Sequence, residues 1–128
     1  MFIFKEKMQS LSKYFAGWEE NHYKGEGHNE LFVYVKDDYK ISFGMDWRFE
    51  VGLIVERNSE ELICVEGGYF KFAKKFNKNN INHRMKKMYK DECYNKIGCD
   101  KERNNDMIDL YIEFLVENGI LTKPADII

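Results

Sequence analysis

A run of basic residues between positions 71 and 90 is the strongest chemical signal in the sequence. The run contains no acid, and its cationic side chains are Lys71, Lys74, Lys75, Lys78, Arg84, Lys86, Lys87 and Lys90. The aromatic residues Phe72, Phe76 and Tyr89 are interleaved among them. Because cations bind phosphates and aromatic rings stack on bases, the run is a candidate nucleic-acid patch. The alternative is a solvated helix face near acidic neighbours, with Phe72 and Phe76 as core anchors.

Acidic residues dominate the rest of the chain, which counts against nucleic acid as the direct ligand. The net charge is −2 over 128 residues, whereas DNA-binding domains are usually basic overall. Acids and aromatic residues gather before the basic run, and such a surface favours a basic protein partner. The predicted partner-binding residues are Glu19, Glu20, Tyr23, Glu26, Asp37, Asp38, Tyr39, Asp46, Trp47, Glu50, Glu60 and Glu61. The competing interpretation is that these acids keep a small domain soluble.

Motifs for catalysis, cofactor binding or metal binding are missing from the sequence. No serine lies in a GxSxG pattern, and Cys64 reads as a small core residue. Cys93 and Cys99 are six residues apart, which does not fit the pairing of ligands in structural zinc sites. We therefore expect a protein without enzymatic activity, cofactor or metal.

The composition predicts a single domain over residues 1–128, because hydrophobic residues make up 44% and aromatic residues 16% of the chain. Three cysteines form no disulfide framework, which is typical of a reducing compartment. No stretch approaches the ~20 apolar residues of a membrane span. We expect a cytoplasmic protein that makes no contact with membranes.

Apolar spacing predicts the elements that position these side chains, beginning with a helix over residues 4–18. One apolar stripe recurs at steps of four and three, and it consists of Phe4, Met8, Leu11, Phe15 and Trp18. The helix is expected to end near Gly17, and residues 21–29 then read as an exposed loop.

Strand signals follow this loop. Strands are expected at residues 31–36, 39–44, 47–57, 61–66 and 69–72. Asp37-Asp38 and Gly67-Gly68 are the predicted hairpin turns. In the third strand, alternation places Trp47 and Phe49 on the same face as Val51.

Two helical patterns complete the chain, at residues 81–96 and 104–118, with Asn118-Gly119 as the final stop signal. The predicted fold class is α+β. It consists of an N-terminal helix, a four- to five-stranded antiparallel β-meander and two C-terminal helices packed on one sheet face.

The acidic meander GMDWRFEVGLIVERNSEELICVEGGYFKF, in a small, motif-free and aromatic-rich chain, resembles the immunity proteins of bacterial contact-dependent growth inhibition and related polymorphic toxin systems. The resemblance implies a specific inhibitor of one cognate toxin domain, often an RNase or DNase, whose active site or substrate it blocks. The partner would then be a basic nuclease. An anti-restriction or anti-CRISPR inhibitor shares these features, and it would use the basic segment 71–90.

Overall fold

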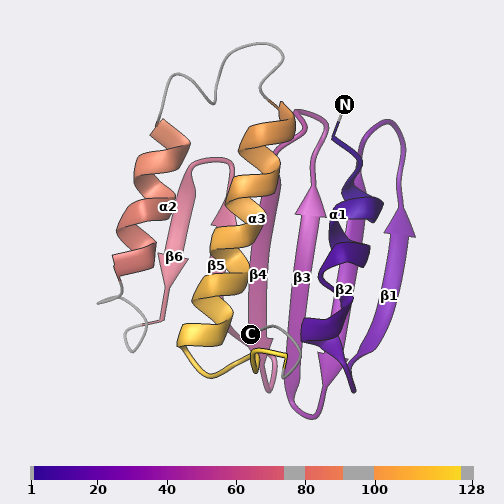
Figure 1. Cartoon of the computed structure of the whole chain (residues 1–128), viewed down its shortest axis with the longest axis vertical. Helices are drawn as coiled ribbons and strands as arrows, with labels where there is room; N and C mark the ends of the chain where they lie inside the picture. The colour runs from indigo at the N-terminus through magenta and orange to yellow at the C-terminus, as the bar shows by residue number, and fades with distance from the viewer. Residues whose placement is uncertain (1, 74–79, 91–99, 125–128) are drawn as a thin grey trace.

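Six antiparallel strands form one sheet in which each strand pairs with its neighbours in sequence, as the computed structural model shows (Figure 1). The structure describes residues 2–73, 80–90 and 100–124. The strands are β1 (Glu19–Lys24), β2 (Glu30–Lys36), β3 (Tyr39–Met45), β4 (Val51–Arg57), β5 (Glu60–Glu66) and β6 (Tyr69–Phe72). The predicted α+β class is confirmed, with one strand more than expected.

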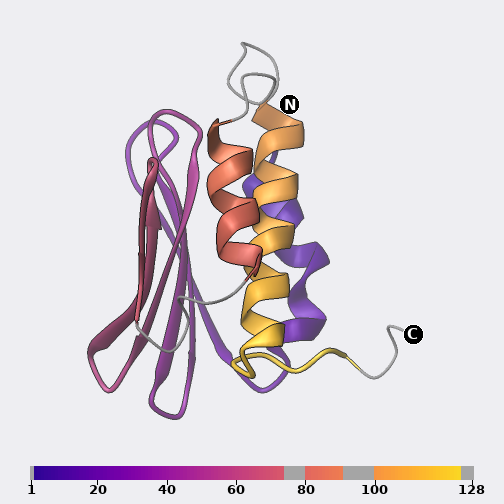
Figure 2. The ribbon, with the colours of Figure 1, turned by 90° about the vertical axis from the view of Figure 1, so that its left-hand side faces the viewer.

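Helices cover one face of this sheet (Figure 2). They are α1 (Phe4–Ser10), the short 3-10 helix η1 (Ser12–Phe15), α2 (Asn80–Lys90) and α3 (Asp100–Glu117). The core lies between the two layers. Phe4 of α1 packs edge-on against Phe32 of β2, with ring centroids 4.9 Å apart. The Tyr111 hydroxyl of α3 donates a hydrogen bond of 2.6 Å to the Val51 carbonyl of β4.

Tight turns join β2 to β3 and β5 to β6, and their backbone explains why polar residues and glycines occupy them. Asp37 has a φ of 54°, and the strands on either side pair at Lys36 and Tyr39. Gly67 and Gly68 both have positive φ, which is the conformation that matches the twist of a two-residue hairpin. The two hairpin turns predicted from the sequence are therefore confirmed.

The N-terminal prediction needs two corrections. The apolar stripe is buried from Phe4 to Phe15 and half-buried at Trp18, but the α-helix ends at Ser10, where the Ser10 hydroxyl donates a hydrogen bond of 2.6 Å to the Lys7 carbonyl. The chain continues as η1 rather than as one helix to residue 18. Residues 21–24 of the loop expected at 21–29 belong to β1, an edge strand whose His22 ring stacks on Phe32 with centroids 4.1 Å apart.

The strand expected at 47–57 begins only at Val51, and residues 46–50 form a turn instead. Trp47 and Phe49 therefore do not share the buried row of β4. The helix expected at 81–96 runs from Asn80 to Lys90, and its last expected residues lie outside the described part of the chain. The helix expected at 104–118 begins one turn earlier, at Asp100.

The C-terminal stop signal is confirmed. Gly119 has a φ of 73°, and its N–H donates to the Val116 carbonyl, while the N–H of Ile120 donates to the Leu115 carbonyl. This pattern satisfies the last carbonyls of α3 and turns the chain out of the helix.

Candidate functional site

The residues predicted to bind a partner do not form one surface, because the sheet separates them into two groups. One group lies at the end with the β2–β3 and β4–β5 turns, and it consists of Glu19, Glu20, Asp37, Asp38, Tyr39, Glu60 and Glu61. The other lies at the opposite end, and it consists of Tyr23, Glu26, Asp46, Trp47 and Glu50. Strands of seven residues put about 20 Å between the two ends.

At the first end, contacts within the chain already occupy part of the predicted set. Arg57 Nε donates to Asp38 Oδ2 at 2.8 Å, and its guanidinium carbon lies 5.0 Å from the Tyr39 ring centroid. The hydrogen bond from Arg57 lowers the pKa of the Asp38 carboxyl. Asp38 and Tyr39 therefore have an internal cationic partner, which weakens their claim as anchors for another protein.

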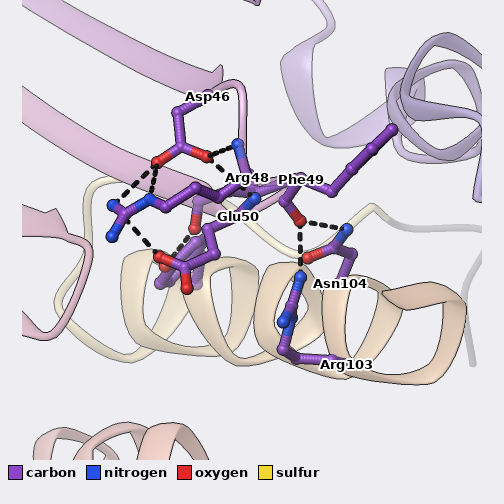
Figure 3. Close-up of polar contacts among 8 residues, drawn as sticks. Asp46, Arg48, Phe49, Glu50, Arg103 and Asn104 are labelled. Atoms are coloured by element: carbon purple, nitrogen blue, oxygen red, sulfur yellow. Dashed lines mark hydrogen bonds and ion pairs between the residues drawn. The ribbon is translucent and has the colours of Figure 1, made fainter. Parts of the chain in front are cut away.

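At the second end, residues 46–50 form a hydrogen-bonded turn, here called the β3–β4 turn (Figure 3). Asp46 Oδ1 accepts the backbone N–H groups of Arg48 at 2.8 Å and Glu50 at 3.1 Å. The Asp46 N–H donates to the Glu50 carbonyl at 3.0 Å. Phe49, the residue before Glu50 in this turn, has a φ of 59°. Left-handed backbone is unusual for a bulky aromatic residue.

Helix α3 braces this turn from the other layer (Figure 3). Arg103 Nη2 and Asn104 Nδ2 both donate to the Phe49 carbonyl, at 2.7 Å and 2.8 Å. Asn104 is only 1% exposed, so its amide is committed to this contact. A non-glycine residue in the left-handed region costs about 1–3 kcal/mol and persists only where its surroundings hold it. The fold thus maintains a strained turn with bonds from two layers.

The β3–β4 turn holds Trp47 out in solvent with Arg48 beside it. Trp47 is 72% exposed, and the Arg48 guanidinium carbon lies 5.7 Å from its ring centroid. Arg48 is fixed in turn by Asp46 Oδ2 at 2.9 Å and Glu50 Oε2 at 3.3 Å. Tryptophan and arginine are the residues most enriched among binding hot spots. The turn therefore presents a preorganised anchor pair.

The face of the sheet opposite the helices, here called the open face, adjoins this turn. Among the described residues, no helix packs on it (Figure 2). Exposed apolar side chains lie on it from three strands: Tyr23, Leu31 and Tyr69. The register sets Tyr23, Leu31, Gly44 and Gly52 side by side across four strands.

A hollow of about 280 Å³ lies in the open face where Gly44 of β3 stands directly opposite Gly52 of β4. We call it the glycine hollow. Leu31, Ile54 and Glu66 are among its lining residues. Sequence reasoning missed it, because two glycines eight positions apart carry no signal until the strand register brings them together.

The basic segment is split by the fold. Lys74, Lys75, Phe76 and Lys78 lie outside the described residues. Lys71 lies on β6 opposite Cys64, and Lys86, Lys87 and Lys90 are exposed on α2. Arg84 Nη1 pairs with Glu113 Oε1 at 2.8 Å.

The described aromatic residues of the basic segment serve the core. Phe72 is buried against Phe114, with ring centroids 5.5 Å apart. Tyr89 packs edge-on against Phe70 with centroids 6.0 Å apart, and burial followed by Glu50 raises the pKa of its phenol. Neither ring is placed to stack on a base, so the exposed part of α2 offers charge alone.

Metal-binding groups of three or more His, Cys, Asp or Glu residues do not occur within residues 2–73, 80–90 and 100–124. Cys64 is buried and unpaired in β5, as expected, and burial raises the pKa of its thiol. Of the helices in this same part of the chain, none has the length and apolar character needed to cross a bilayer.

Sequence reasoning also missed Arg103 and Asn104, the α3 residues that hold the turn. They lie more than 50 positions after Phe49 and show no motif.

Comparison with family models, with curated proteins and with solved structures gives no match for this chain.

Proposed function

We propose that this chain is a toxin-neutralising binding protein of the immunity type, which docks a basic protein domain on the open face at its Trp47 end. The braced β3–β4 turn is the observation that carries this proposal. The strained backbone at Phe49 belongs to the turn that holds Trp47 in solvent, and a binding role for Trp47 gives that strain a purpose.

Charge supports a basic partner. Residues 19–66, which contain five of the six strands, hold twelve acidic residues against five basic ones. Complementary charge speeds encounter and excludes wrong partners, while the buried centre of an interface supplies the affinity. Trp47, Tyr23 and Leu31 would supply that centre, and the acids around them would steer a phosphate-binding groove toward it.

Inhibition by occlusion needs no catalytic group on the inhibitor. A nuclease groove lined by cations attracts an acidic, aromatic-rich surface, because that surface imitates the negative charge and the stacking rings of a nucleic acid. The open face combines these two properties at the Trp47 end.

The test is to purify the chain with its bound partners and identify them by native mass spectrometry. We expect a stoichiometric complex with a basic protein that is toxic when expressed alone and harmless when this chain is co-expressed. Trp47→Ala should weaken the complex by about 30-fold or more, since hot-spot truncations cost about 2–4 kcal/mol.

Ile3→Ala is the matched control, because Ile3 is also a large apolar residue, is 47% exposed, and lies next to α1 rather than on the sheet. Its complex should match that of the unmodified chain. Equal affinity of the Trp47→Ala variant would refute the proposal. Recovery of nucleic acid that is released by salt would instead indicate nucleic-acid binding by the lysines of α2.

A further inference from the structure

We propose that the glycine hollow receives an arginine side chain from the basic partner, an inference that rests on the proposed function. The hollow measures about 280 Å³, at the lower limit of the roughly 300–1,000 Å³ of small-molecule sites, and it is large enough to hold a single side chain.

The fold does not require a glycine at position 44. A Cβ built there would meet only Leu31 Cδ1, at 3.5 Å, which is ordinary van der Waals contact. Its backbone does not lie in the left-handed region that favours glycine. Glycine in a strand costs about 0.5–1 kcal/mol relative to alanine, so its presence here calls for another reason. Keeping the hollow open is such a reason.

Gly52 provides the contrast. A Cβ at this position would come within 2.5 Å of the Val65 carbonyl oxygen, so packing alone explains this glycine. The two residues together leave the centre of the open face without side chains across two adjacent strands.

The lining has the chemistry of an arginine receptor. Leu31 and Ile54 offer apolar walls for the methylene stem. Four acidic residues lie in the lining, and they are Glu30, Asp46, Glu50 and Glu66. Its described residues include no lysine or arginine.

Among these acids, Glu66 is the one left for a partner. Glu30 pairs with His22 at 3.2 Å, and Asp46 and Glu50 hold Arg48. The backbone of Glu66 pairs with Tyr69, but its side chain is exposed and makes no hydrogen bond or ion pair with another described residue. A guanidinium can bond a carboxylate with two parallel N–H groups, which favours arginine over lysine at such a rim.

The test is a titration of the isotope-labelled chain, followed by the amide signals of Gly44, Gly52 and Glu66. The probes are capped Gly-Arg-Gly, Gly-Lys-Gly and Gly-norleucine-Gly tripeptides. We expect the arginine peptide to shift these signals with an affinity about tenfold higher than the uncharged norleucine peptide. The lysine peptide should bind measurably more weakly than the arginine peptide.

Two variants locate the binding. Gly44→Val fills the hollow and Glu66→Gln removes its free charge, and each should reduce the affinity for the arginine peptide about fivefold or more. Glu56→Gln, on the same strand as Gly52 but outside the lining, should leave it unchanged. Thermal unfolding of each variant confirms that it is folded.

Absence of shifts at these amides, equal binding of the three peptides, or unchanged binding by Gly44→Val would each overturn the proposal. The titration contains no partner, so it separates the two hypotheses. If the chain binds the arginine peptide but neutralises no toxin, the inference about the hollow stands and the proposed function is refuted. If Gly44→Val leaves the affinity of a toxin complex unchanged, the proposed function stands and the inference about the hollow is refuted.

Discussion

The facing glycines Gly44 and Gly52 predict opposite effects for the same substitution. Alanine at position 44 adds a methyl group that touches only Leu31, at 3.5 Å. Alanine at position 52 places that methyl group 2.5 Å from the Val65 carbonyl oxygen, well inside the 3.4 Å at which ordinary contact begins. The two positions pair directly, so differences in strand environment are small.

The expected sizes follow from these distances. Gly44→Ala lowers the conformational entropy of the unfolded chain and introduces no strain in the folded one. It should therefore stabilise the chain by about 0.5–1 kcal/mol. Gly52→Ala gains the same entropy but must move β4 from β5 beside the Leu53–Val65 pair. Overpacking of this kind costs about 1–3 kcal/mol, so the net result should be a loss of about 1–2 kcal/mol.

Thermal unfolding measures both effects. For a chain of this size, 1 kcal/mol corresponds to roughly 4 °C, so the Tm should rise by about 2–4 °C for Gly44→Ala and fall by about 4–8 °C for Gly52→Ala. Urea unfolding with an unchanged m-value would show that both states keep their compactness. Shifts in the same direction, or a Gly52→Ala variant as stable as the unmodified chain, would refute the distinction between the two glycines.

Two further predictions concern stability. Tyr111→Phe removes the buried 2.6 Å bond to the Val51 carbonyl, so the free energy of unfolding in urea should fall by about 1–2 kcal/mol; an unchanged midpoint would contradict this. Arg57 lowers the pKa of Asp38 in the folded chain, so this contribution is present above the unfolded pKa of about 3.9 and disappears as the pH falls through the lower folded value. Asp38→Asn should therefore destabilise the chain at pH 7, and the difference should vanish in acid; a constant difference down to pH 2 would exclude the pairing.

Local pattern was sufficient for most of the fold. The stripe from Phe4 to Phe15 is buried, and the Gly67-Gly68 hairpin lies where its backbone preference predicts. β1 was missed because an edge strand exposed on nearly every residue has no apolar alternation to reveal it. Its pairing with β2 is a tertiary effect that the residues of β1 alone do not reveal.

The candidate site was less accessible to sequence reasoning. Trp47 was singled out, but the alternation of residues 47–57 also indicated a strand through it. The turn forms because Asp46 bonds two backbone N–H groups and α3 holds the Phe49 carbonyl. The first contact is local, but the second depends on residues more than 50 positions away. The division of the acids between two sheet ends likewise needed the register.

The order of the chain has a consequence for biosynthesis. The strands pair in sequence order, so each hairpin can form as it leaves the ribosome, whereas α3, which covers β4, ends at Glu117, long after β6 ends at Phe72. At about 10 residues per second, the part of the helix-facing side that α3 covers stays exposed for several seconds, whereas α1 and η1 precede the strands in the chain. Phe72, which is nearly buried against Phe114 of α3 in the finished protein, is then open to chaperones or to other nascent chains. Ribosome pausing between residues 73 and 117 should therefore lower the yield of folded protein more than pausing within the strands.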